Sequence, residues 1–160
     1  AFRQKHIGFV FQSYNLLPEL TAAENVAMPL MFKGVDPDVR LLEAKKMLCR
    51  VGLKDRMDHF PNQMSGGQQQ RVGIARAFIT QPEVVFADEP TGNLDTRTTK
   101  EVMHMIRGFA HRFHQTIVLV SHDPEMTEYA DRIVTLIDGR IVSNVENQVK
   151  AEIDAAPYIE

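Results

Sequence analysis

The sequence predicts an α/β fold with a parallel sheet, and two observations support this prediction. First, the second half of the chain alternates short apolar segments, expected to be strands, with amphipathic segments of helical periodicity. This alternation is typical of parallel strands joined by crossover helices. Second, the segment VVFA (84–87) is wholly apolar, as expected for a strand covered on both faces. The first half adds one further strand, followed by a mostly helical insert.

The composition is that of an ordinary globular domain and argues against several classes of protein. The chain has 160 residues, of which 44% are apolar and 24% charged, enough to bury a core in one domain. Its net charge of −3 argues against a nucleic-acid partner, which requires a basic surface to offset phosphates. No apolar run approaches the ~20 residues that a membrane-spanning helix needs. The single cysteine excludes an internal disulfide, and we expect a protein that is soluble by itself.

The first strand and the first helix are predicted near the start of the chain. Residues 6–11 (HIGFVF) form a β-branched and aromatic run, and a loop follows them. Thr21 can cap a helix, with Glu24 at the capping-box position. Pro29 is expected to kink that helix or end it early, because proline removes a backbone donor. The helical spacing predicts that its inward face comprises Ala23, Val26, Ala27, Leu30 and Met31.

Two further helices are predicted before the second strand. One lies within residues 34–53 and stops at Gly52, and the other follows Ser65. A polar connection joins them. Their predicted core positions are Leu41, Ala44, Leu48, Val51, Val72, Ala75, Phe78 and Ile79.

The second half supplies the remaining elements. A helix is predicted over residues 96–113, a buried strand over 116–121 and a short helix over 123–130. Two more strands are joined at Asp138-Gly139, a dipeptide typical of a tight hairpin. The polar, acidic tail, 144–160, is expected to be partly disordered.

Two carboxylates, Asp88 and Glu89, follow the VVFA strand. Ligands collect at the carboxyl ends of strands in open parallel sheets. Successive residues leaving a strand point to different sides, so the two carboxylates can have different tasks. One could hold Mg²⁺ through water, and the other could polarise an attacking water. The alternative is that both residues only cap the next turn.

Two polar residues follow the neighbouring predicted strands. His122, in the segment SHDP, could donate a hydrogen bond to a phosphate oxygen, although a histidine at a strand end is more often an ordinary surface residue. Gln12 ends the first strand, where its amide could bind a Mg²⁺-linked water or the attacking water. We expect Gln12, Asp88 and His122 to converge around one hollow.

The segment SGGQ (65–68) is a candidate phosphate-binding element. Ser65 can cap the helix behind it, and Gly66 and Gly67 let the backbone approach a ligand without a Cβ clash. The positive end of that helix favours anions. A glycine-rich turn before a helix is the alternative interpretation. The presence of three such elements on one predicted sheet favours a phosphate.

Together these segments resemble the ATP-binding cassette (ABC) family of transport ATPases. The resemblance covers residues 7–142 and includes five motifs in the family's order. FVFQ resembles the glutamine loop, MSGGQQQRV the signature motif, VVFADEP the Walker B strand, GNLD the D-loop and SHD the switch histidine. The segments FQSYNLLPELTAAENV and ADEPTGNLD are similar to the corresponding segments of ATPases that serve lipoprotein-releasing, macrolide-exporting and cell-division systems. In that subgroup leucine is usual at Met64 and alanine at Gly73.

The resemblance implies a partial P-loop NTPase fold of the RecA-like kind with a helical signature subdomain. No G-x-x-x-x-G-K-[ST] phosphate loop occurs in the sequence. We therefore expect the chain to be the C-terminal two-thirds of a cassette, with the phosphate-loop strand and helix missing. The expected divisions are a strand and glutamine loop (1–12), a helical subdomain (13–81), a RecA-like core (82–143) and a polar tail (144–160).

The resemblance also implies a role for each site residue. Glu89 and His122 would be catalytic, and Asp88 and Gln12 would hold Mg²⁺. The ATP of an opposite subunit would be contacted by Ser65, Gly66, Gly67 and Gln68. Gln12 and Asp95 would also bind nucleotide, and Asp95 would lie at the dimer seam.

The expected partners are a second ATPase subunit, paired head to tail, and a membrane permease on the cytoplasmic face of the cell membrane. The chain alone is expected to bind ATP weakly and to self-associate. The alternative functions are an ABC-type ATPase of DNA repair or chromosome maintenance, and a non-catalytic pairing module. The short interval between Gln12 and Ser65, without sustained heptads, disfavours the coiled-coil insertion of the repair proteins.

Overall fold

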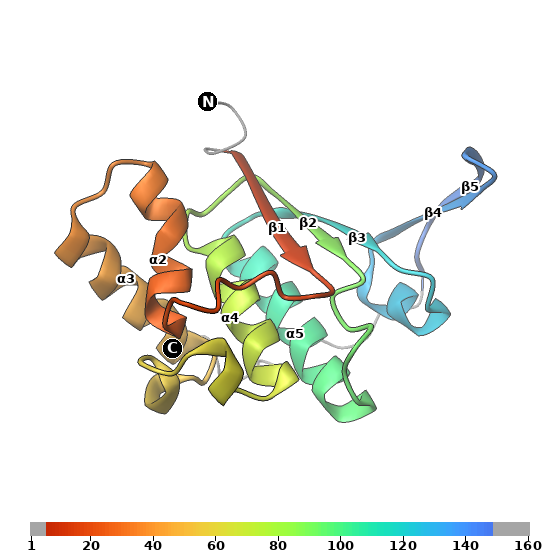
Figure 1. Ribbon diagram of the computed structural model, residues 1–160. Helices are drawn as coiled ribbons and strands as arrows, with labels where there is room; N and C mark the ends of the chain where they lie inside the picture. The colour runs from red at the N-terminus through yellow and green to blue at the C-terminus, as the bar shows by residue number, and fades with distance from the viewer. Residues whose placement is uncertain (1–5, 149–160) are drawn as a thin grey trace.

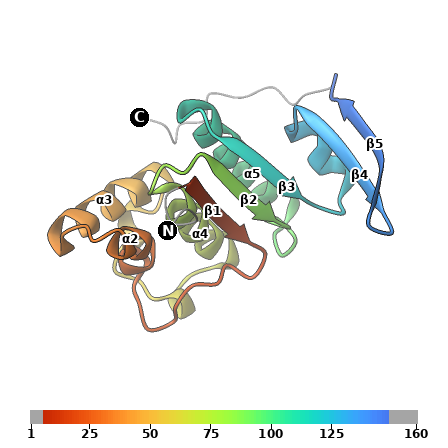
Figure 2. The ribbon, with the colours of Figure 1, turned by 90° about the horizontal axis from the view of Figure 1, so that it is seen from above.

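The protein is described by a computed structural model, which defines residues 6–148. Its centre is a three-stranded parallel sheet in the order β1–β2–β3, formed by Ile7–Phe11, Val84–Asp88 and Thr116–Val120. The helices α4 (Gly66–Phe78) and α5 (Thr96–Arg112) cover one face of this sheet, as Figures 1 and 2 show from two directions. The predicted α/β class and its parallel sheet are confirmed.

The helical insert between β1 and β2 lies beside α4. It contains α2 (Ala22–Phe32) and α3 (Pro37–Arg50), followed by two short 3₁₀ turns at Lys54–Arg56 and Pro61–Gln63. The capping box at the start of α2 is present as predicted, and Gly52 adopts a φ of +73° directly after α3. The fully buried side chains of α3, α4 and α5 include Leu48, Ile74, Phe78, Met105 and Phe109. The core therefore lies between the sheet and these helices.

Two expectations about α2 are wrong: that the helix could end early at Pro29, one of the two outcomes expected there, and that Met31 faces inward. The helix does not end early at Pro29 but continues to Phe32. Proline interrupts only one backbone hydrogen bond at this position, and the helix needs only one more turn before its end. Met31, predicted to face inward, is 43% exposed, because the buried face of α2 is confined to its first half.

Within the described residues the sheet is covered on one face only, which corrects the expectation of strands buried on both faces. Alternate residues of β2 are buried, and Val118 and Val120 of β3 are 38% and 52% exposed. Phe9 stacks on Phe86 across the open face, with ring centroids 5.6 Å apart. Within residues 6–148 no second helical layer packs against this face. The apolar composition of the strands therefore does not report two-sided burial in this structure.

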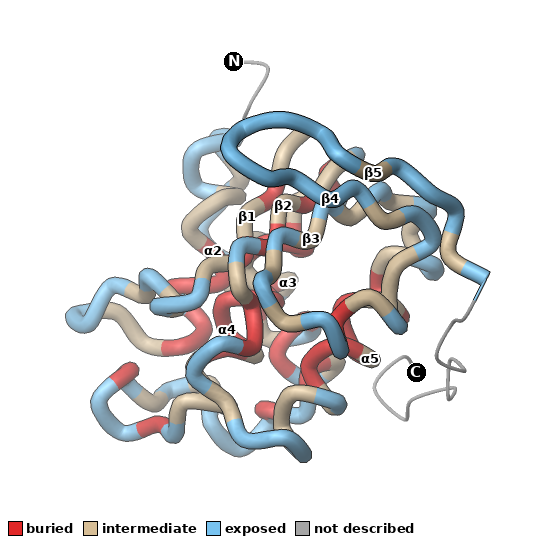
Figure 3. The backbone as a smooth tube through the Cα atoms, turned by 90° about the vertical axis from the view of Figure 1, so that its right-hand side faces the viewer, coloured by how far each residue is buried: buried red, intermediate tan, exposed pale blue. Residues whose placement is uncertain are grey.

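The last two strands form a separate hairpin instead of extending the parallel sheet. β4 (Arg132–Ile137) and β5 (Arg140–Glu146) pair antiparallel, and Asp138 and Gly139 both have positive φ at the predicted turn. A 3₁₀ segment, Pro124–Tyr129, connects β3 to β4. Among the described residues β3 pairs with β2 alone, so no strand links it to β4. Figure 3 shows the hairpin exposed along most of its length.

The expected C-terminal tail is only partly described. Its first residues, 144–146, belong to β5 and not to a disordered segment. Residues 149–160 lie outside the described part of the chain.

Candidate functional site

Three predicted site segments meet at the carboxyl edge of the parallel sheet. The register pairs Phe11 with Asp88 and Asp88 with Val120. Gln12, Glu89 and Ser121 are therefore the first residues beyond the ends of three adjacent strands. Figure 2 shows the three arrowheads at the same edge.

The side chain of Glu89 is held by the segment after β3. One carboxylate oxygen, Oε1, accepts hydrogen bonds from the backbone N–H of His122 (2.8 Å) and from its Nδ1 (2.6 Å). The other oxygen, Oε2, accepts the hydroxyl of Ser121 at 3.0 Å. Because the carboxylate can only accept, Nδ1 carries the proton, and Nε2 of the exposed His122 ring is left to face a ligand. Sequence reasoning missed Ser121 as a partner, since a serine at a strand end carries no signal of its own.

These contacts shift the pKa of both partners in opposite directions. Partial burial raises the pKa of Glu89, but the hydrogen bonds from His122 and Ser121 outweigh this effect and leave it below its ordinary value. The hydrogen bond to Glu89 and the negative charge of its carboxylate raise the pKa of His122. Both groups are therefore ionised at the same time over a wider pH range than they would be without this contact.

Glu89 reaches this position through an unusual backbone conformation. Its φ is +43°, in the left-handed region, and its N–H donates to the carbonyl of Val120 at 2.9 Å. Asp88 is still part of β2 and is exposed at its end. The two adjacent carboxylates consequently have different environments.

A cavity of about 450 Å³ lies beside Glu89 and His122. Hydroxyl groups and the start of α5 form much of its wall, with Thr91, Thr96, Thr99 and Ser121 among the lining residues. Gln12 and Asp88 do not line this cavity, and the convergence of Gln12, Asp88 and His122 around one hollow stays a prediction. Asp88 continues the alternation of β2 and lies on the open face, whereas the left-handed turn directs Glu89 toward β3.

Gln12 lies against the turn that follows Glu89. A Cβ added to Gly92 would be 2.6 Å from Nε2 of Gln12, so the end of the Gln12 side chain occupies the space that glycine leaves open. The carbonyl of Gln12 also accepts a hydrogen bond from Nδ2 of Asn93 at 3.2 Å. The structure therefore brings the glutamine loop and the GNLD segment together.

The SGGQ segment forms the amino-terminal end of α4. Ser65 Oγ accepts the N–H of Gln68 (3.3 Å), and Oε1 of Gln68 accepts the N–H of Ser65 (3.0 Å), a complete capping box. The acceptor atoms are thus engaged within the helix. The hydroxyl hydrogen of Ser65 and the amide hydrogens of Gln68 remain the groups suited to an anion.

The two glycines of this segment allow close contacts within the chain. A Cβ on Gly66 would lie 2.8 Å from the Tyr14 hydroxyl, and one on Gly67 would lie 2.8 Å from Cγ2 of Thr98. Thr98 also donates to Oδ2 of Asp95 at 2.6 Å. The amino-terminal ends of α4 and α5 therefore lie side by side, which sequence reasoning did not predict.

Asp95 is the N-cap of α5. Its Oδ1 accepts the N–H groups of Arg97 and Thr98, both at 3.1 Å. The hydrogen bonds from the side chain and backbone of Thr98 lower the pKa of Asp95. Its carboxylate is thus ordered by the start of its own helix.

Comparisons with known proteins agree with this arrangement. A sequence profile described as ABC transporter matches residues 1–92, and the chain belongs to this family. It is 48% identical over 139 residues to the macrolide export ATP-binding/permease protein MacB of Pasteurella multocida, covering 87% of this chain and 21% of that protein. It is 53% identical over 139 residues to an uncharacterized ABC transporter ATP-binding protein of Thermotoga maritima, covering 87% of this chain and 59% of that protein.

A solved structure shows the same fold. The ATP-binding cassette MJ0796, described as a dimer in a post-hydrolysis state bound to ADP and Pi, matches with a TM-score of 0.80 and 40% identity. The match covers 90% of this chain and 64% of that cassette. The chain thus has the α/β fold of ABC ATPases but spans about a fifth of MacB and about three-fifths of the shorter relatives. No helix in residues 6–148 is long and apolar enough to span a membrane.

Proposed function

We propose that this chain is part of an ATP-hydrolysing subunit of an ABC transporter, with Glu89 as the residue that polarises the attacking water. The observation that carries this proposal is the contact of Glu89 with His122 at the carboxyl edge of the sheet. The exposed Nε2 of His122 would contact the γ-phosphate. Glu89 and His122 come from neighbouring strand ends, so the two groups can act on one phosphate.

Asp88 and Gln12 are the residues that would hold Mg²⁺. Both lie exposed at the carboxyl edge, and the register brings the ends of their strands side by side. A carboxylate and an amide oxygen are hard donors that suit Mg²⁺, which keeps several water and phosphate ligands. The donor set therefore fits the ion, which would supply charge stabilisation for the transferred phosphoryl group.

The end of α4 would close the nucleotide site of a second subunit. Ser65, Gly66, Gly67 and Gln68 present free hydrogen-bond donors and the positive end of a helix of 13 residues. Asp95 lies beside them through Thr98, which suits a place at the subunit seam. The dimeric state described for MJ0796 supports this pairing.

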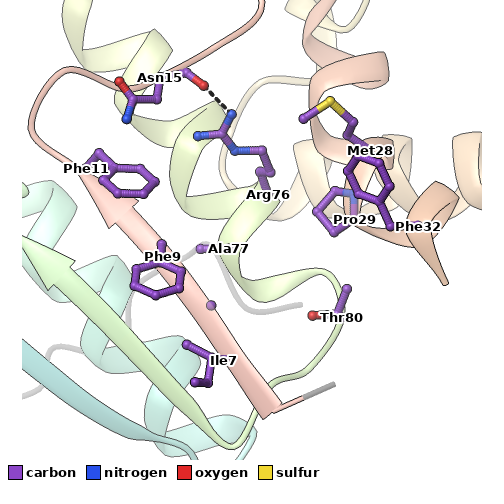
Figure 4. A pocket seen from close by; sticks show the side chains of 11 residues that line it. Ile7, Phe9, Phe11, Asn15, Met28, Pro29, Phe32, Arg76, Ala77 and Thr80 are labelled. Atoms are coloured by element: carbon purple, nitrogen blue, oxygen red, sulfur yellow. Dashed lines mark hydrogen bonds between the residues drawn. The ribbon is translucent and has the colours of Figure 1, made fainter. Parts of the chain in front are cut away.

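A permease partner would contact the cavity between β1, α2 and α4. This cavity of about 330 Å³ is lined mainly by apolar side chains, and Figure 4 shows Phe9, Phe11, Met28 and Phe32 around it. Phe32 is 59% exposed at its rim. The cavity also adjoins the loop after Gln12, and the MacB relatives are described as ATP-binding/permease proteins. These features favour a membrane partner on the cytoplasmic face of the cell membrane.

We further propose that the 160-residue chain alone binds ATP weakly and self-associates. Its sequence has no phosphate-loop lysine motif, and each missing charge-assisted hydrogen bond costs about 1.5–3 kcal/mol of interaction. Exposed apolar residues on β3 and on the hairpin favour association: Val118, Val120, Leu136, Ile137, Ile141 and Val142. Micromolar ATP affinity with turnover, or a clean monomer at high concentration, would contradict these two statements respectively.

The test of the proposed function is Glu89→Gln in the full-length protein. The variant should lose ATP turnover and accumulate an ATP-bound dimer, measured by phosphate release and size-exclusion chromatography. Glu83→Gln is a matched control, because Glu83 makes the same 2.6 Å contact with a histidine, His6, at the opposite end of the sheet. Unchanged turnover in Glu89→Gln would remove Glu89 as the base.

A further inference from the structure

Gln70 is a buried amide that connects α4 to the turn after Glu89. Its side chain is 0% exposed, and its Nε2 donates to the carbonyl of Pro90, twenty positions along the chain. Its Oε1 is buried and has no hydrogen-bond partner among residues 6–148. This side chain touches neither of the cavities described above.

The Pro90 carbonyl belongs to a turn that must be held in place. Glu89 precedes it with a φ of +43°, and such backbone conformations persist only where the surroundings over-determine them. Two backbone bonds help: Glu89 N–H to Val120 O, and Gly92 N–H to Glu89 O. Pro90 has no N–H, so its carbonyl is the one backbone group through which this residue can be anchored.

The unpartnered oxygen argues against a purely structural role for the amide. An apolar side chain of similar length would fill the same space without burying an unsatisfied acceptor. The amide differs from such a side chain in its directed donor, and that donor points at Pro90. Beyond packing, the amide therefore contributes a hydrogen bond that fixes the position of the turn.

We propose that Gln70 is a positioning residue for Glu89: by holding the Pro90 carbonyl, it keeps Glu89 in the left-handed conformation that directs its carboxylate to Ser121 and His122. This inference deepens the proposed function and depends on it for its catalytic consequence. It also links the helix that carries SGGQ to the carboxylate of its own subunit.

The first test is steady-state ATP hydrolysis by the full-length protein with Gln70→Met, which removes the donor and keeps the length. The expected result is a roughly 100-fold lower kcat, the loss caused by a misplacement of about 1 Å. KM for ATP should change by less than about two-fold, because the hydrogen bond of Gln70 goes to Pro90, which is not among the proposed nucleotide-binding residues. The matched control is Gln115→Met. Gln115 also donates to a proline carbonyl, that of Pro82, and also has a buried, unpartnered Oε1, but it lies away from the site.

The comparison separates positioning from stability. The melting temperature shows that both variants remain folded, and only Gln70→Met should lower kcat. An unchanged kcat in Gln70→Met, or an equal loss in Gln115→Met, would refute the proposal.

The second test does not depend on ATP hydrolysis. In a crystal structure of the Gln70→Met variant, Glu89 should leave the left-handed region and its 2.6 Å contact with His122 Nδ1 should lengthen. Retention of both features would refute the positioning role. If the wild-type protein does not hydrolyse ATP, the proposed function fails, and this second measurement still decides the role of Gln70.

Discussion

The close packing of β1 on α4 can be tested with two glycine-to-alanine changes of opposite expected sign. At Gly8, in β1, an added Cβ would lie 2.5 Å from the backbone carbonyl of Ala77 and 3.1 Å from Cγ of Pro82. A main-chain oxygen cannot rotate away, so the strand and the helix must separate. Such overpacking costs about 1–3 kcal/mol, which lowers the melting temperature of a chain of this size by roughly 2–12 °C.

Gly73 provides the matched control. It lies inside α4, and an added Cβ would meet the Tyr14 carbonyl at 3.6 Å and Oε1 of Gln70 at 3.8 Å, both ordinary contacts. Alanine in a helix interior is favoured over glycine by up to about 1 kcal/mol, so Gly73→Ala should raise the melting temperature by roughly 2–4 °C.

Thermal unfolding followed by circular dichroism at low protein concentration would measure both changes. A Gly8→Ala variant as stable as the wild type would mean that β1 does not approach α4 as closely as described. A destabilised Gly73→Ala variant would contradict the space found around that residue.

Three further predictions concern the site and the helix ends. The pKa of His122, measured by NMR titration, should lie above 6.5 and fall in Glu89→Gln. The pKa of Glu89 is lowered and that of His122 is raised, so their contact should contribute most to stability between the ordinary pKa values of the two groups. This contribution should be lost as pH rises through the raised pKa of His122 or falls through the lowered pKa of Glu89; a pKa of His122 unmoved by Glu89→Gln would contradict the contact. Arg76 donates to the carbonyls of Asn15 and Tyr14, so Arg76→Met should reduce the free energy of unfolding by about 1.5–3 kcal/mol in urea denaturation, and a loss under about 0.5 kcal/mol would show that these bonds contribute little. Thr21→Ala removes the capping box of α2 and should cost about 1 kcal/mol in the same assay, where an unchanged midpoint would count against the cap.

Local chemistry made most secondary structure predictable from the sequence. The capping residue Thr21, the hairpin dipeptide at Asp138 and the helical spacing around Phe78 and Phe109 are short-range signals, and the structure confirms the elements that they predict. The error at Pro29 has a local cause too, since one lost hydrogen bond is tolerated close to a helix end.

Long-range features could not be read in the same way. An apolar strand such as β2 indicates a buried position but not how many layers cover it, and its open face is a property of the whole assembly of elements. The partners of the site residues were equally hidden: Thr98 joins Gly67 to Asp95, and Gln70 reaches Pro90, through side chains that have no motif of their own. The motifs identified the residues of the proposed site, and the structure added the contacts that fix the positions of those residues.

The contact between Gln12 and Gly92 has a mechanical consequence. The glutamine amide occupies the volume that a β-carbon would fill, and Asn93 holds the main chain of the same residue. A displacement of the segment after β1 toward the segment after β2 would press the Gln12 side chain against Gly92 and would disturb the hydrogen bond from Asn93. The hydrogen bond from Asn93 joins the two loops directly, so a movement of either loop changes the surroundings of the other.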